Sequence, residues 1–195
     1  MKNYQKNKAA NLTKNKPLNS PKSAVIWLTG LAGAGKTTFA SEIFRHLKEQ
    51  HGNVILLDGD VFRAIFGESG YEKEQRLVLA RKLHALAGFL EQNDLIVIVA
   101  AIAAFDEIYA LNRKNFKNYF EIYVKCDFDE LVRRDKKGLY SGALRGEVKN
   151  VMGVDIEYDK PNAHFILENS TLENLQEKTA LLFSKVDEFL AHIKI

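Results

Sequence analysis

Residues 30–37 read Gly30-Leu31-Ala32-Gly33-Ala34-Gly35-Lys36-Thr37 and match the pattern G-x-x-x-x-G-K-[ST] without a gap. An apolar run at residues 24–28 (AVIWL) comes directly before this stretch, and a helical pattern over residues 36–50 follows it. A buried strand, a glycine-rich loop and a helix in this order predict a phosphate-binding loop, or P-loop. The alternative is a glycine-rich turn with a chance lysine, and the flanking strand and helix weigh strongly against it.

The loop residues have separate expected roles in holding MgATP. Small residues let successive backbone N–H groups face the β-phosphate, and the following helix presents its positive end to the anion. We expect the Lys36 ammonium to reach the β- and γ-phosphates, the Thr37 hydroxyl to ligate Mg²⁺ and Thr38 to contact the α-phosphate. The predicted ATP-binding residues of this stretch are Gly30, Leu31, Ala32, Gly33, Ala34, Gly35, Lys36, Thr37 and Thr38.

The rest of the chain alternates between buried strands and amphipathic helices. Further strands are expected at residues 54–57, 95–100, 119–124 and 164–167, and further helices at residues 72–93, 106–115 and 172–193. This alternation predicts an α/β fold of three layers, with a parallel five-stranded sheet between helices. Trp27, in the first strand, is expected in the core.

Length and composition limit the broad class. A chain of 195 residues favours one domain, and no apolar run reaches the ~18 residues that a membrane span needs. The first 22 residues lack the apolar core of a signal peptide, so a cytoplasmic protein is expected. Cys126 is the only cysteine, which excludes an internal disulfide, and the five histidines lack metal-ligand spacing.

The net charge of +3 comes from the amino-terminal end. Residues 1–22 hold six lysines and no acid, which leaves 22 basic against 25 acidic residues for residues 23–195. We expect residues 1–22 to be a disordered, solvated tail, with an anchor for acidic partners as the less favoured interpretation. Residues 23–195 are the expected folded domain, and its charge argues against a nucleic-acid partner.

Other motifs narrow the class of nucleotide-binding protein. The guanine-reading N-K-x-D of GTPases is absent, and the strand at residues 95–100 lacks the terminal acid of a Walker B ATPase. Small-molecule kinases remain, in which the second strand often ends in an acid that faces the acceptor. Here that strand ends in Asp58-Gly59-Asp60, for which ordinary turn chemistry is the alternative explanation.

Three further stretches carry a resemblance to one family. LDGDVFR (57–63), RRDKKGLY (133–140) and GEVKNVMGVDIEYDKP (146–161), behind WLTGLAGAGKTT (27–38), resemble the adenylyl-sulfate kinase family. The similarity runs over residues 25–169. It implies a P-loop kinase fold with a lid segment, and the use of MgATP to phosphorylate the ribose 3'-hydroxyl of adenosine 5'-phosphosulfate.

The resemblance also implies roles for single residues. Asp60 matches the acid beside the acceptor hydroxyl, Asp58 the acid near the water shell of Mg²⁺, and Arg63 and Arg76 the arginines that hold the acceptor's 5' anion. Lys36, Asp60 and Arg63 are therefore the expected catalytic residues. Lys137, Gly138 and Leu139 match the part of the lid that folds over the acceptor, and Arg134 matches the lid arginine that faces ATP.

The sequence departs from the family around the acceptor base. The family's A-F-I-S-P-[YF]-R stretch is AAIAAFD at residues 100–106, where Ile102 keeps its place as an expected acceptor contact. Tyr71 and Val151 stand where the family sandwiches adenine between two phenylalanines, and Leu79 replaces an asparagine. One lost ring removes a stacking surface worth ~1–3 kcal/mol per base in comparable sites.

These departures leave the acceptor open. Adenosine 5'-phosphosulfate, with drift in the pocket, and a cytidine nucleotide, as in the related cytidine diphosphoramidate kinases, have nearly equal support. A regulator that binds nucleotide without catalysis is a third and weaker alternative, because Lys36, Thr37, Asp60 and Arg63 are intact. Dimers are common in the resembling family, so the leucine-rich face at residues 83–90 is a candidate homodimer contact, although core packing explains it more simply.

Overall fold

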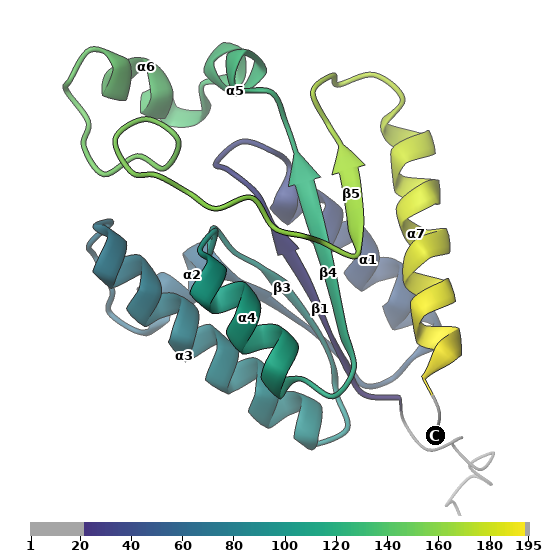
Figure 1. Ribbon diagram of the computed structural model, residues 1–195. Coiled ribbons are helices and arrows are strands. Elements are labelled where there is room, and N and C mark those ends of the chain that lie inside the picture. The colour runs from purple at the N-terminus through teal and green to yellow at the C-terminus, as the bar shows by residue number, and fades with distance from the viewer. Residues whose placement is uncertain (1–21, 194–195) are drawn as a thin grey trace, which may run out of the picture.

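A computed structural model describes residues 22–193, which form one parallel sheet with helices on both faces (Figure 1). The strand order is β2-β3-β1-β4-β5, and every neighbouring pair is parallel. The strands are β1 (Ala24–Thr29), β2 (Val54–Asp58), β3 (Ile96–Ala100), β4 (Tyr119–Lys125) and β5 (Phe165–Glu168). The five predicted strands are confirmed, each within one residue at either end.

The helices form the two outer layers. Helices α1 (Lys36–Gln50) and α7 (Leu175–His192) cover one face, and α3 (Lys73–Gln92) and α4 (Asp106–Asn115) cover the other (Figure 1). The three-layer α/β prediction is therefore confirmed. Three short helices were not predicted: α2 (Gly59–Ile65), α5 (Phe128–Arg134) and α6 (Leu139–Leu144), the last two joined by a 3-10 turn over Lys136–Gly138. The final helix begins at Leu175 and not at residue 172.

The core explains why the apolar runs of the sequence become strands. Every residue of β1 and β3 is buried, as expected for parallel strands covered on both faces. Trp27 is fully buried, as predicted. On α3, Leu83 is fully buried and Leu86 and Leu90 pack against the core. The leucine-rich face of this helix is therefore used largely for packing within the domain.

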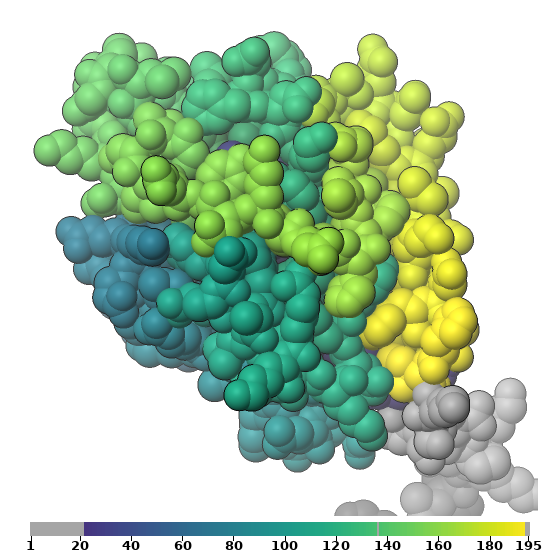
Figure 2. All heavy atoms as spheres, in the orientation of Figure 1, coloured from purple at the N-terminus to yellow at the C-terminus, as the bar shows by residue number. Residues whose placement is uncertain are grey.

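The carboxyl ends of the strands meet along one edge, where the chemistry-bearing residues gather. Asp58 pairs with Ala100, which pairs in turn with Leu28 beside the phosphate-binding loop. The chain between β4 and β5 passes over this edge with α5 and α6, and in the space-filling view it forms a layer above α3 and α4 (Figure 2). Open parallel sheets bind ligands in the crevice outside these carboxyl ends.

Some predictions fall at or beyond the limits of the described chain. Residues 1–21 lie outside it, so the predicted tail is not tested there; Lys22 itself is held by the fold, with its Nζ donating to the Leu190 carbonyl at 2.6 Å. None of the helices within residues 22–193 has the length and apolarity to cross a membrane. The same residues contain no cluster of three or more His, Cys, Asp or Glu side chains suited to a metal ion.

Candidate active site

The loop between β1 and α1 has the backbone that only glycine tolerates at two decisive points. Gly30 has a φ of 147°, and a Cβ there would lie 2.4 Å from the Val124 carbonyl oxygen of β4. Gly35 has a φ of 106°, and a Cβ there would lie 2.8 Å from the Asn169 side-chain nitrogen. The two motif glycines are thus required by close approach as well as by conformation.

The two polar motif residues lie at the start of α1 and contact groups at the same edge of the sheet. Lys36 Nζ donates to the Leu31 carbonyl at 2.9 Å, inside the loop. The Thr37 hydroxyl donates to Asp58 Oδ2 at 2.8 Å, which joins the loop to the end of β2. A hydroxyl beside a carboxylate is an oxygen pair of the kind that Mg²⁺ prefers, so these two residues fit the ion.

Asp58 has two structural relations at once. Its Oδ1 accepts hydrogen bonds from the backbone N–H groups of Asp60 at 2.9 Å and Val61 at 3.3 Å, which caps the amino end of α2. Its Oδ2 faces Thr37. The local-turn explanation of this acid and the nucleotide-site explanation are therefore compatible, because each uses a different oxygen.

A cavity of about 690 Å³ opens at this edge and brings together most of the predicted site residues. Its walls include Ala32, Gly33, Gly35, Lys36, Thr37, Thr38, Asp58, Asp60, Arg63, Tyr71, Arg76, Ile102, Lys137, Leu139 and Val151. Five predicted residues do not line it: Gly30, Leu31, Ala34, Arg134 and Gly138. The volume suits a ligand of nucleotide size.

Two arginines on one side of the cavity share an aromatic neighbour. The guanidinium of Arg63 lies 4.4 Å from the centre of the Tyr71 ring, and that of Arg76 lies 5.3 Å from it. Arg63 donates to the Gly70 carbonyl, and Arg76 Nε donates to the Tyr71 carbonyl at 2.7 Å. Burial, followed by the positive charge of Arg63, lowers the pKa of Arg76. An anion bound beside both guanidinium groups would offset the repulsion between their like charges, so the two arginines form a candidate anion-binding site.

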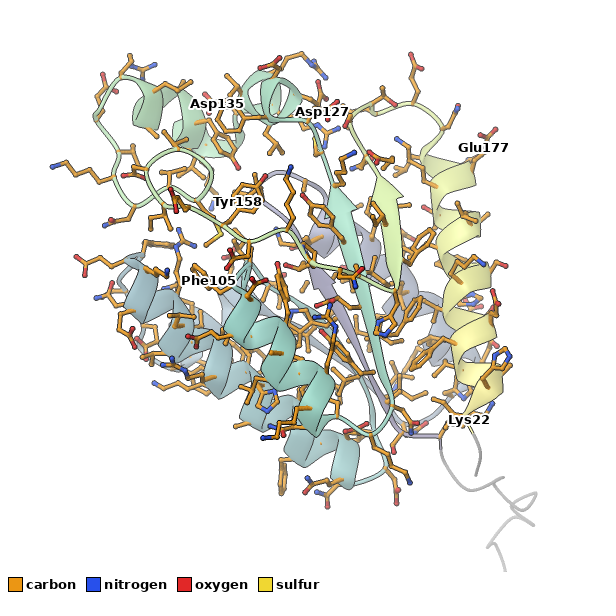
Figure 3. All side chains as sticks on the ribbon, in the orientation of Figure 1. Lys22, Phe105, Asp127, Asp135, Tyr158 and Glu177 are labelled. Carbon is orange, nitrogen blue, oxygen red and sulfur yellow. The ribbon has the colours of Figure 1, made fainter. Side chains whose placement is uncertain are left out.

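The predicted lid segment follows α5 and has an unusual backbone. Asp135 and Lys137 have φ angles of 32° and 64°, and Gly138 one of 68°. Asp135 Oδ1 accepts from the backbone N–H groups of Tyr140 and Ser141 at 2.9 and 3.1 Å; bonds from Ser141 and then Tyr140 lower the pKa of this carboxyl despite opposing desolvation. Figure 3 shows Asp135 on this segment, above the carboxyl edge of the sheet. The Tyr140 hydroxyl donates to the Ala32 carbonyl at 3.0 Å and so ties the lid to the phosphate-binding loop.

Arg134 lies between the lid and the loop, and not on the cavity wall. Its guanidinium donates to Glu130 at 2.8 Å, to the Gly33 carbonyl at 3.2 Å and to the Asn169 carbonyl at 2.7 Å. Its predicted role toward ATP stays a prediction. Asn169 was not among the predicted site residues, because nothing in the sequence after β5 marks it beyond its place at the end of a strand.

The wall expected to face the acceptor base is aliphatic. Leu79 and Val151 are 6% and 2% exposed, and they line the cavity with Ala101, Ile102 and Ala103. Val151 is held in place through its N–H, which donates to Asp155. This wall offers small aliphatic groups, and the isopropyl group of Val151 stands where the family pattern leads one to expect a second ring.

The substituted loop after β3 is tethered by the segment that precedes β5. The N–H of Asp159 donates to the Ala104 carbonyl at 3.0 Å, and its Oδ2 accepts from the Asp106 N–H at 2.9 Å, at the start of α4. Tyr109 adds a third bond, from its hydroxyl to the Asp159 carbonyl at 3.1 Å. In Figure 3, Phe105 and Tyr158 mark these two segments.

Comparison with known proteins places this site in a family. The model of the adenylylsulphate kinase family matches residues 22–167. The chain belongs to the adenylyl-sulfate kinase family. A cytidine diphosphoramidate kinase of Campylobacter jejuni is 49% identical over 162 residues, which cover 83% of this chain and 95% of that protein. A probable adenylyl-sulfate kinase of Archaeoglobus fulgidus is 39% identical over 71% of this chain and 90% of its own length.

Solved structures agree with this membership. The Mycobacterium tuberculosis APS kinase CysC, in complex with AMPPNP and APS, has a TM-score of 0.75 and 29% identity, covering 88% of this chain and 99% of that one. The crystal structure of APE1195 has the same TM-score at 32% identity, covering 87% of this chain and 98% of that one. The protein is accordingly an ATP-using kinase of the adenylyl-sulfate kinase family, which sets aside the alternative of a regulator without catalysis.

Proposed function

We propose that this kinase transfers the γ-phosphoryl group of ATP to the ribose 3'-hydroxyl of cytidine diphosphoramidate. The observation that carries the proposal is the aliphatic wall of the cavity, with Val151 and Leu79 where the family has a phenylalanine and an asparagine. The 49% identity to a cytidine diphosphoramidate kinase, against 39% or less for the adenylyl-sulfate kinases compared with this chain, supports the same acceptor.

The roles proposed for the phosphate end follow from the contacts of the loop. Thr37 and Asp58 would hold Mg²⁺, directly and through water, and the ion would neutralise charge on the β- and γ-phosphates. Lys36 would bind the same phosphates. Asp60, one residue into α2 and on the cavity wall, would orient the acceptor hydroxyl and take its proton as the new O–P bond forms.

The roles proposed for the acceptor end follow from the two arginines. Arg63 and Arg76 would bind the charged diphosphoramidate group, for which planar guanidinium forks are well suited. Lys137 and Leu139 would close over the acceptor from the lid, and exclusion of water would limit ATP hydrolysis. We propose that residues 23–195 form this kinase domain and that it acts in the cytoplasm; a homodimer remains a prediction.

Adenosine 5'-phosphosulfate is the second candidate acceptor. The arginine pair would suit a phosphosulfate equally well, and the similar APS kinase from Mycobacterium tuberculosis was solved with APS and AMPPNP. This candidate requires that an adenine be held beside Val151 without a second aromatic ring.

The proposal is tested by steady-state kinetics with purified protein and MgATP. ADP release is measured over a concentration series of each acceptor separately, and kcat/KM is compared. We expect kcat/KM for cytidine diphosphoramidate to be at least about ten-fold higher than for adenosine 5'-phosphosulfate, because a change in one or two pocket contacts gives discrimination of about this size. A preference for adenosine 5'-phosphosulfate would overturn the proposed acceptor and leave the kinase assignment intact.

A further inference from the structure

We propose that Asn169 is a positioning residue for ATP, acting through the phosphate-binding loop. It holds the Ala34–Gly35 peptide in the orientation that presents the Gly35 N–H to the nucleotide cavity. The inference depends on ATP use by this family and not on which acceptor nucleotide is correct.

The contacts of Asn169 fix its side chain from two sides. The residue is 5% exposed and directly follows β5. Its Nδ2 donates to the Ala34 carbonyl at 2.8 Å, and its Oδ1 accepts from Lys178 Nζ of α7 at 3.2 Å. The Lys178 contact also assigns the amide orientation, because an ammonium group can only donate. Its backbone N–H donates to the Lys125 carbonyl of β4 at 2.7 Å, so the whole residue is anchored to the sheet.

The geometry of a peptide bond turns this contact into an orientation of the loop. In a trans peptide the C=O of one residue and the N–H of the next point in opposite directions. Neither Ala34 nor Asn169 is among the residues that line the cavity, so we infer that the Ala34 carbonyl points to Asn169 on the side away from the cavity and that the Gly35 N–H points to the opposite side. Gly35 lines the cavity, and backbone N–H groups of such loops are the donors that bind phosphate.

Asn169 also connects the loop to the lid. Its carbonyl accepts from Arg134, whose guanidinium simultaneously donates to the Gly33 carbonyl at 3.2 Å. Two consecutive loop carbonyls, those of Gly33 and Ala34, are thereby held by side chains from outside the loop. Asp135, which follows Arg134 in the chain, begins the lid. The loop and the start of the lid therefore share one support. Among residues 22–193, the side-chain hydrogen bonds of Asn169 and Arg134 go to Glu130, Gly33, Ala34, Asn169 and Lys178, and none of these is an expected acceptor residue.

The test measures nucleotide binding without any acceptor. The dissociation constant of Mg-AMPPNP is determined by calorimetry for the wild type, Asn169→Ala and Asn169→Asp. We expect Asn169→Ala to weaken binding about ten-fold, the ordinary effect of leaving one buried carbonyl without its donor. Asn169→Asp keeps the shape but sets an acceptor against an acceptor, so we expect it to weaken binding at least as much.

A matched control uses an asparagine with the same chemistry at the other end of the sheet. Asn118 Nδ2 donates to the Ser23 carbonyl at 2.9 Å, beside the start of β4. Asn118→Ala removes a similar bond far from the nucleotide and should leave the dissociation constant within about two-fold. With whichever acceptor is active, the Asn169 variants should raise the KM of ATP and leave the acceptor KM within about two-fold, a split that general loosening of the fold would not produce.

Unchanged Mg-AMPPNP binding in both Asn169 variants, or equal increases in the KM of ATP and of the acceptor, would overturn the inference. If the Asn169 variants do not fold, Lys178→Met decides, since this side chain is partly exposed and its loss leaves the buried Asn169 donor in place. The substitution removes the bond that orients the Asn169 amide, and it also removes the Lys178 bond to the Thr171 carbonyl at 2.6 Å, so Thr171→Ala, which leaves that carbonyl in place, is measured beside it. A weakening of Mg-AMPPNP binding by about three-fold supports the inference, and unchanged binding contradicts it.

Discussion

Replacement of Arg76 by lysine separates the two tasks that this guanidinium performs. Arg76 is 8% exposed, and it joins the segment before α3 to the loop on the opposite wall of the cavity. Its Nε donates to the Tyr71 carbonyl at 2.7 Å, and a second nitrogen donates to the Asn150 carbonyl at 2.8 Å. A lysine ammonium at this position reaches one of these two carbonyls and leaves the other without a donor.

The size of both effects follows from the lost hydrogen bonds. An unsatisfied buried acceptor costs ~1–3 kcal/mol, so we expect Arg76→Lys to destabilise the fold by about 2 kcal/mol and to lower Tm by about 4–8 °C. Loss of the guanidinium fork to the acceptor's anion removes a charge-assisted bond worth ~1.5–3 kcal/mol. That energy corresponds to a fall of about 10- to 150-fold in kcat/KM for the acceptor.

The assay combines thermal denaturation with ADP release at varied acceptor and ATP concentrations. Arg81→Lys is the matched control, because Arg81 is on the same helix and its side chain is half-exposed. Within residues 22–193, its ion pairs are with the surface acids Glu74 and Glu107 only. Exposed ion pairs contribute ~0–1 kcal/mol, so this variant should change neither Tm nor kinetics appreciably. An Arg76→Lys enzyme whose acceptor kcat/KM stays within three-fold of wild type would refute the anion-binding argument.

Three further variants test the phosphate end, the pocket wall and a titrating side chain. Thr37→Val removes the hydroxyl that faces Asp58 from an exposed position, so kcat should fall by about a hundred-fold with little change in Tm; an unchanged kcat would rule out a metal-binding role for Thr37. Val151→Phe restores a ring to the pocket and should shift the ratio of kcat/KM toward adenosine 5'-phosphosulfate by at least about five-fold, and no shift would exclude Val151 as a specificity residue. Partial desolvation, followed by the Arg113 charge, lowers the pKa of the exposed His164, so the unfolded chain binds more protons near and below pH 6.5 and stability falls as the pH drops through that range. The urea midpoint should therefore fall less between pH 7.5 and 5.5 in His164→Gln than in the wild type, and equal decreases would show that His164 does not contribute.

The sheet and its main helices were predictable because their signals are local. Strands β1 and β3 are buried on both faces and read as unbroken apolar runs, and α4 has the predicted bounds, residues 106–115. The short helices α2, α5 and α6 were missed because six or seven residues hold too few periods of a helical pattern. Asp58 caps the amino end of helix α2, but the stretch Asp58-Gly59-Asp60 is also compatible with a simple turn, so the sequence alone did not predict the helix.

The site was predictable where a motif carries it and not where tertiary contacts do. The motif placed Lys36 and Thr37 at the start of α1, and the family resemblance placed Thr37 and Asp58 near the same Mg²⁺ ion. The direct hydrogen bond between these two side chains, 21 residues apart, was not predicted. Arg134 lies 101 residues from Gly33 and contacts the carbonyl side of the loop. Asn169 is 135 residues from Ala34, and only the folded sheet brings the two together.

The most direct test of the proposed reaction is a single competition experiment. The enzyme is given MgATP with equal concentrations of cytidine diphosphoramidate and adenosine 5'-phosphosulfate, and phosphorus NMR of the mixture identifies which acceptor gains a phosphate and at which carbon. The account predicts a new phosphomonoester coupled to the ribose H3' of the cytidine compound, with the adenosine compound largely unchanged. A new phosphate on the adenosine compound alone, or at any position other than the 3'-hydroxyl, would contradict it.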